Sequence, residues 1–229
     1  MLSPEELQAV VLSLRIALVA MAASLIPGIL VALLLARGRL PGKLLLDGVV
    51  HLPLVLPPVA VGYLLLIAFG RNGTIGRFLD ETFGIVFAFR WTGAALACAI
   101  MGFPLMVRAI RLAIEAVDER LEEAAGTLGA NPLWTFAVVT LPLALPGVVA
   151  GALLSFAKAM GEFGATITFA ANIPGETRTL SSAIYTFLQV PGGEGGALRL
   201  TLVSLAVSMG ALVASEVLAR RVARRRGRQ

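Results

Sequence analysis

Glu122-Glu123-Ala124-Ala125-Gly126-Thr127-Leu128-Gly129-Ala130-Asn131-Pro132 lies between two long apolar stretches and is followed by Leu141-Pro142. The residues before Gly129 are mostly strong helix formers, and a glycine there can adopt the positive φ that ends a helix. Asn131 and Pro132 form a favourable N-cap and first-turn pair for a second helix. The insert (residues 118–142) is therefore predicted to hold two short helices, set at an angle and available to another protein. An ordinary surface loop is the alternative.

The composition around the insert is that of an integral membrane protein. Of 229 residues, 58% are hydrophobic and 14% are charged, and the mean hydropathy is +0.88. A soluble domain would have about 25% charged residues, so much of this apolar surface must face lipid. The net charge is +5, but few aromatic residues accompany the basic ones, and no nucleic-acid partner is expected. The single Cys98 and single His51 exclude a disulfide framework and a multi-histidine metal site.

Several apolar stretches are long enough to cross a bilayer, which takes about 20 residues of helix. Helices are expected because every backbone amide must find a partner inside lipid, so the fold class is all-α. Pro53, Pro57 and Pro58 mean that the second stretch cannot be a straight rod. Five spans are predicted, at Leu12–Ala36, Leu46–Phe69, Trp91–Ile114, Leu143–Phe169 and Leu200–Leu218.

Basic residues set the expected orientation. The side that holds the insert and the C-terminal tail receives twelve of the nineteen lysines and arginines, whereas the other side receives five. Positive residues collect on the cytoplasmic side, so the N-terminus is predicted outside and the C-terminus and insert inside. Residues 1–229 are expected to form one transmembrane domain with its core at about 8–219. The basic tail 220–229 would anchor the topology and contact anionic lipid of the bilayer.

The insert also carries a family signature. Glu123-Ala124-Ala125, Gly129 and Leu141-Pro142 resemble the EAA signature of ABC importer permeases, in which a coupling-helix pair docks in a groove of the ATPase subunit. The resemblance implies a type I ABC importer transmembrane fold. The chain has no phosphate-binding loop of its own, so ATP and Mg²⁺ are expected on a separate subunit and no cofactor on this one. The residues to which the resemblance assigns ATPase coupling are Glu123, Ala124, Ala125, Gly129, Asn131 and Pro132.

Three further stretches narrow the resemblance to the permease subunits of molybdate importers. They are residues 52–63 (LPLVLPPVAVGY), residues 108–111 (RAIR) and residues 161–179, which include GEFGAT and NIPGETRT. The resemblance implies a homodimer in a bacterial inner membrane, two cytoplasmic ATPase copies and a periplasmic oxyanion-binding protein. Tungstate is a possible further substrate. Sulfate and thiosulfate permeases share much of these patterns and are the alternative.

Two charges lie inside the fourth predicted span. Lys158 and Glu162 are one helical turn apart and can pair, and intramembrane charges usually face protein or water. One hypothesis is that Lys158 lines a path for a divalent anion and that its pairing with Glu162 prevents the anion from binding too tightly to leave. The alternative is that the pair is purely structural. The adjacent glycines would allow a bend where an outer gate closes, and the proline pair of the second span is either a packing kink or a bend in the pathway. The pathway or gate candidates are Pro57, Pro58, Lys158, Gly161, Glu162, Phe163 and Gly164.

Two other function classes are less compatible with the sequence. A proton-coupled secondary anion transporter would need repeated membrane halves, and Asp47 with His51 could serve it as a proton relay, although solvated or capping roles fit them better. An intramembrane hydrolase would need a nucleophile–base pair deep in the spans. The chain is therefore expected to be a permease subunit without catalysis of its own. Gly147 and Gly151, one turn apart, suit close helix packing either within the chain or at a dimer contact.

Overall fold

The computed structural model describes residues 2–38 and 41–226, and the regular elements in those ranges are all helical. The element bounds are α1 (Pro4–Arg37), α2 (Lys43–Val55), α3 (Pro58–Phe69), α4 (Thr74–Phe83), α5 (Trp91–Glu115), α6 (Glu119–Thr127), α7 (Pro132–Thr135), the π-helical segment η1 (Phe136–Thr140), α8 (Leu141–Met160), α9 (Gly164–Phe169), α10 (Leu180–Leu188) and α11 (Glu194–Arg226).

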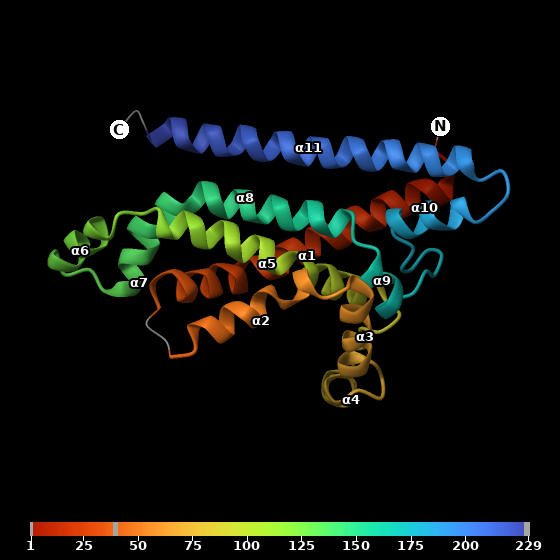
Figure 1. Ribbon diagram of the computed structural model, residues 1–229, viewed down its shortest axis with the longest axis horizontal. Helices are drawn as coiled ribbons and strands as arrows, with labels where there is room; N and C mark the ends of the chain where they lie inside the picture. The colour runs from red at the N-terminus through yellow and green to blue at the C-terminus, as the bar shows by residue number, and fades with distance from the viewer. Residues whose placement is uncertain (1, 39–40, 227–229) are drawn as a thin grey trace.

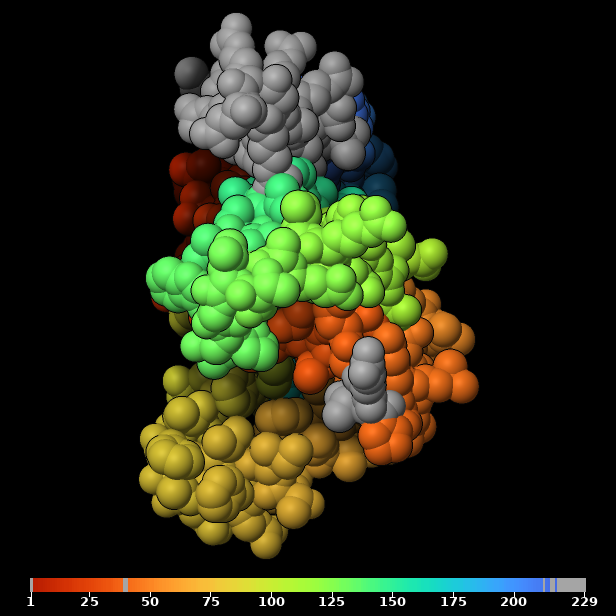
Figure 2. Space-filling view, turned by 90° about the vertical axis from the view of Figure 1, so that its left-hand side faces the viewer, coloured from red at the N-terminus to blue at the C-terminus, as the bar shows by residue number. Residues whose placement is uncertain are grey.

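Four long helices, α1, α5, α8 and α11, run along the longest dimension of the molecule (Figure 1). The insert and the end of α11 lie at one end, and the start of α1 lies with α10 at the other. Helices α3 and α4 project sideways from the middle, and Figure 2, seen from the insert end, shows them as a separate arm. The insert and the end of α11 thus share one side, as the predicted topology requires.

Within the part of the chain that the structure describes, three helical stretches are long and apolar enough to cross a bilayer: Pro4–Arg37, Trp91–Glu115 and Pro132–Met160. A fourth is counted if α2 and α3 are taken together, so the predicted number of five spans and their N-out, C-in direction remain predictions. The first predicted span, Leu12–Ala36, lies within α1, which starts earlier because Ser3 and Glu6 form a reciprocal capping box. The fifth, Leu200–Leu218, lies within α11.

The second predicted span, Leu46–Phe69, is wrong as a single helix, although the predicted departure from a straight rod is confirmed. Helices α2 and α3 meet at an angle of 114°. Neither Pro57 nor Pro58 has an amide hydrogen that could continue the helical hydrogen bonds of α2. Helix α3 begins at Pro58, and proline is tolerated there because the first amide of a helix has no partner within the helix.

The fourth predicted span, Leu143–Phe169, needs correction at both ends. It stops at Met160, and a separate short helix, α9, begins at Gly164. At the other end no break separates the insert from the span, because α7 continues through η1 into α8. The π-helical segment admits one extra residue per turn and keeps the helix continuous.

The regions between the spans are partly as predicted. Pro174, Glu176 and Arg178 interrupt the stretch after Phe169, which predicts a short helix at Ser181–Gln189 rather than a further span, and α10 confirms that helix. Helix α4 was not predicted, because its charged residues were counted only as markers of topology. The two glycines of α8 serve packing within the chain: a Cβ added at Gly151 would lie 2.9 Å from the carbonyl oxygen of Met106, and one added at Gly147 would collide with Ala113. They therefore bring α8 against α5.

Candidate functional site

Local caps set the two helices of the insert, and the predicted cap at Asn131 is one of them. The Asp118 carboxylate accepts a hydrogen bond from the Arg120 amide at 3.0 Å at the start of α6. Gly129 has φ +88° directly after that helix, a conformation that favours glycine. The Asn131 side chain accepts from the Trp134 amide at 2.8 Å and starts α7.

The insert presents an apolar surface to its surroundings. No residue of α6 is buried, and Glu123 and Ala124 are both exposed. The large side chains of Leu128, Leu133 and Trp134 are 89%, 81% and 63% exposed, at the end of the molecule farthest from α10. Sequence reasoning did not single out Leu133 and Trp134 as contact residues. Exposed apolar groups of this size suit a partner protein better than water.

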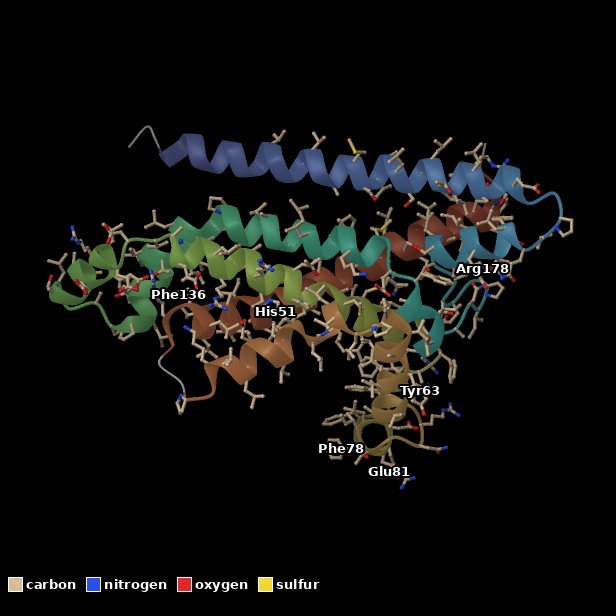
Figure 3. All side chains as sticks on the ribbon, viewed as in Figure 1. His51, Tyr63, Phe78, Glu81, Phe136 and Arg178 are labelled. Atoms are coloured by element: carbon tan, nitrogen blue, oxygen red, sulfur yellow. The ribbon has the colours of Figure 1, made fainter. Side chains whose placement is uncertain are left out.

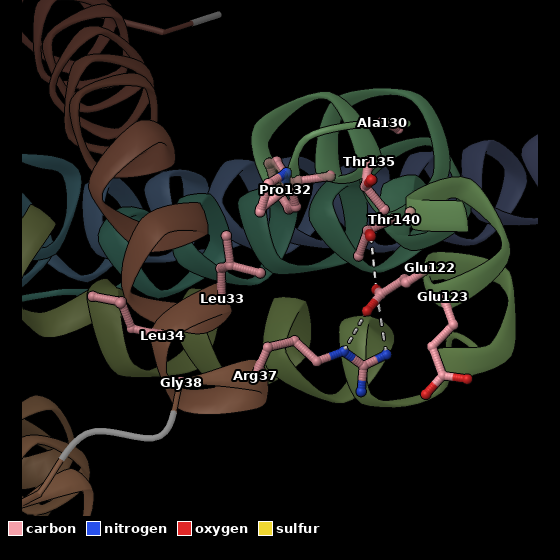
Figure 4. A pocket seen from close by; sticks show the side chains of 12 residues that line it. Leu33, Leu34, Arg37, Gly38, Glu122, Glu123, Ala130, Pro132, Thr135 and Thr140 are labelled. Carbon is pink, nitrogen blue, oxygen red and sulfur yellow. Dashed lines mark hydrogen bonds and ion pairs between the residues drawn. The ribbon is translucent and has the colours of Figure 1, made fainter. Parts of the chain in front are cut away.

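Polar contacts hold the insert to the membrane helices. The Arg37 side chain, at the end of α1, donates to the Val117 carbonyl at 2.7 Å, and its Nε lies 3.2 Å from Glu122 Oε2. The Thr140 hydroxyl donates to Glu122 Oε1 at 2.7 Å. Arg37, Glu122 and Thr140 line a cleft of about 510 Å³ between α1 and the insert (Figure 4). Glu123 has no hydrogen bond or ion pair with any described residue. The sequence did not single out Arg37, Glu122 or Thr140.

The two helix breaks, predicted separately, meet in space. A Cβ added at Gly164, the first residue of α9, would lie 2.7 Å from the Cβ of Pro58, the first residue of α3. One helical turn along α3, a Cβ at Gly62 would lie 2.6 Å from the Ala165 carbonyl oxygen. Of the gate candidates, Pro58 and Gly164 therefore meet in one contact between α3 and α9.

The predicted pair of charges is formed beside this contact. Lys158 Nζ lies 2.6 Å from Glu162 Oε2, and Glu162 Oε1 accepts from the Ala165 amide at 3.0 Å. The side chains are 30% and 1% exposed respectively, so the carboxylate is enclosed while the lysine side chain is partly exposed. Glu162 lies beyond the last turn of α8, and its side chain accepts a hydrogen bond from an amide in the first turn of α9. The Phe163 ring packs on Tyr185, with ring centroids 5.0 Å apart.

The Asp47–His51 pair is not arranged as an isolated relay. His51 Nδ1 lies 2.9 Å from the Asp47 carbonyl oxygen, and Arg111 of α5 donates to the Asp47 carboxylate at 3.0 Å. Arg111 also pairs with Glu115 on its own helix. Figure 3 marks His51 on α2, and it marks Tyr63 on the projecting arm formed by α3 and α4. The described residues contain no group of three or more His, Cys, Asp and Glu side chains that could hold a metal.

Comparison with known proteins gives concordant matches. A family model described as the inner membrane component of binding-protein-dependent transport systems matches residues 28–224. The chain is 59% identical over 227 residues to the molybdenum transport system permease protein ModB of Escherichia coli strain K12, covering 99% of both chains. It is 39% identical over 187 residues to the sulfate transport system permease protein CysT of Salmonella typhimurium strain LT2, covering 82% of this chain and 67% of that one.

Solved structures resemble the fold. A bacterial ABC transporter involved in the import of the acidic polysaccharide alginate matches 96% of this chain and 80% of its own, with a TM-score of 0.76 at 16% identity. At that identity the likeness concerns the arrangement of helices alone.

Proposed function

Because the chain belongs to the family of binding-protein-dependent transport system inner membrane components, we propose that it is the permease of an ATP-driven importer and carries molybdate across a bacterial inner membrane. The choice of substrate rests on sequence identity. The chain is 59% identical to a molybdenum transport permease over 99% of its length, whereas it is 39% identical to a sulfate transport permease over 82% of its length. The chain is a multi-pass membrane subunit without catalysis of its own. Tungstate, a dianion of the same shape, is a second cargo under this proposal.

The partners follow from this assignment. Two copies of the chain would enclose the path, and two cytoplasmic ATPase subunits would bind ATP and Mg²⁺, so this chain needs no cofactor. A periplasmic oxyanion-binding protein would deliver the cargo. The exposed side chains of Leu128, Leu133 and Trp134 support an ATPase contact at the insert, since apolar groups on a short helix pair suit a groove in a partner.

The residues of the insert would divide the work of coupling. Glu123 and Ala124, both exposed, would contact the ATPase, with the small side chain of Ala124 permitting close approach and the charge of Glu123 setting register. Gly129 and the Asn131–Pro132 cap would fix the angle between the two helices. Closure of the ATPase dimer on ATP would displace this pair.

The displacement would reach the cargo path through α8. Helices α7, η1 and α8 form one continuous helix from Pro132 to Met160, so movement of the insert is passed directly to the break after α8. There Lys158 would attract the dianion through its partly exposed side chain, while Glu162 keeps the site close to neutral and prevents trapping. The α3–α9 contact would open and close the path beside it.

The test is transport by the assembled complex. The permease is reconstituted in vesicles with its ATPase and binding protein, and ATP-dependent uptake of molybdate, tungstate and sulfate is measured at equal concentrations. We expect molybdate-loaded binding protein to stimulate hydrolysis and uptake, with sulfate-loaded protein much weaker. If sulfate is taken up in preference to molybdate, sulfate replaces molybdate as the proposed substrate. If the permease alone shows proton-driven flux, the proposal of an ATP-driven importer is wrong. Wild-type uptake by Lys158→Ala with normal assembly would remove the pathway role of that lysine.

A further inference from the structure

The signature glutamate, Glu123, is not the residue that fastens the insert to the spans. Its neighbour Glu122 carries the contacts: one carboxylate oxygen accepts from the Thr140 hydroxyl at 2.7 Å, and the other lies 3.2 Å from Arg37 Nε. The side chains of Arg37 and Glu122 are only 20% and 21% exposed. The ion pair is therefore partly shielded from water and stronger than a surface pair.

Apolar packing does not hold α6 in place, because none of its residues is buried. Its fixed points are the chain links at either end and these polar contacts. Arg37 also pairs with Glu119 at 2.9 Å, but the Glu119 side chain is 71% exposed, and an ion pair so open to water contributes little. Glu122 is therefore the main side-chain connection from α6 to the first membrane helix.

The two partners of Glu122 belong to different spans. Arg37 is the last residue of α1, which continues to Pro4 at the opposite end of the molecule. Thr140 is 2% exposed and is the last residue of η1, where the insert joins α8. A single carboxylate therefore ties α6 to the ends of two membrane helices that are far apart in sequence.

We propose that Glu122 is a positioning residue for transport, and that the Arg37–Glu122–Thr140 network makes α1 and α8 move together when the insert is displaced. This inference rests on the proposed function and adds a second route, through α1, to the direct connection through α8. Without the network, α6 could follow the ATPase while α1 stays behind. Hydrolysis would then continue with less transport.

The test compares matched variants in the reconstituted complex with ATPase and binding protein, using molybdate as cargo. Glu122→Gln removes the charge, Thr140→Val removes one hydrogen bond at nearly constant shape, and Glu119→Gln is the control on the same arginine. We expect Glu122→Gln to lower the number of molybdate ions moved per ATP by about tenfold, in keeping with the loss of charged hydrogen bonds. Thr140→Val should lower this number by a smaller factor, and Glu119→Gln should leave it within about twofold of the wild-type value.

Further readouts separate this role from simple loss of structure. In Glu122→Gln, the ATPase should still co-purify and the thermal midpoint should remain close to that of Glu119→Gln. Amide hydrogen exchange in α6 should rise, a change measurable without any cargo. A Glu122→Gln complex that transports like Glu119→Gln, or α6 exchange equal to wild type, overturns the proposal. If Glu122→Gln does not assemble with the ATPase, the same two measurements, molybdate moved per ATP and hydrogen exchange in α6, are made on Thr140→Val and decide the question. If wild type moves no molybdate, the proposed substrate fails, while the exchange experiment still tests the network.

Discussion

Adding one methyl group at Gly62 tests the close contact between α3 and α9. The new Cβ would lie 2.6 Å from the Ala165 carbonyl oxygen and 2.8 Å from Thr168 Cβ, whereas ordinary contacts begin at 3.4 Å. The helices would have to separate by roughly 0.8 Å, and such overpacking costs about 1–3 kcal/mol. Gly48 provides the matched control, because it is also helical, on α2, and a Cβ there meets nothing within 4 Å.

Both alanines gain helix propensity of about 1 kcal/mol, so the comparison isolates the packing cost. For a chain of this length each kcal/mol corresponds to roughly 2–4 °C, so Gly62→Ala should melt about 2–12 °C below Gly48→Ala. The assay is thermal unfolding of the purified proteins in one detergent, with molybdate uptake measured in parallel. Because the contact joins the two breaks, uptake should fall in Gly62→Ala and not in Gly48→Ala. Equal midpoints and equal uptake would refute the reasoning.

Three further outcomes follow from described contacts. Gly129→Val should remain in the membrane but lower molybdate uptake per ATP, since φ +88° costs a non-glycine residue about 1–2 kcal/mol; unchanged coupling would contradict it. Lys158→Met should lower the thermal midpoint by the equivalent of about 1–3 kcal/mol, a figure that is reduced because the lysine side chain is partly exposed. Adding Glu162→Gln to the same chain should restore the midpoint, because it removes the unpaired charge. If the double variant is no more stable than Lys158→Met, the pair is not stabilising. Ser13→Ala should cost about 1–3 kcal/mol in thermal unfolding, because it leaves the buried Leu180 amide, 2.7 Å from the serine oxygen, without its acceptor.

Features that depend on neighbouring residues could be predicted from the sequence. The caps at Asp118 and Asn131, the turn at Gly129 and the pairing of Lys158 with Glu162 all act within four residues along the chain. Hydropathy alone located the long apolar helices, since bilayer thickness fixes the length of a span. The role of the insert in coupling came from resemblance, and it stays a proposal.

Features that depend on distant partners could not be predicted in this way. Glu122 looks like any solvated carboxylate until Arg37, 85 positions away, is brought beside it. The glycines after Met160 predicted only a bend, whereas α8 ends there and the Glu162 side chain accepts from the Ala165 amide of a separate helix, α9. The contact between the break at Pro58 and the break before Gly164 requires the 114° bend between α2 and α3, and the amino-acid composition does not predict the size of that angle.

The π-helical segment fixes the helical phase of the insert. A turn of π-helix holds one residue more than a turn of α-helix, and one residue of α-helix corresponds to about 100° of rotation. Removing a single residue from Phe136–Thr140 would turn this stretch into α-helix and rotate everything before it by about that angle relative to α8. The direction in which Leu133 and Trp134 would face the proposed ATPase partner is thus set by one residue of chain length, independently of which side chains would form the contact.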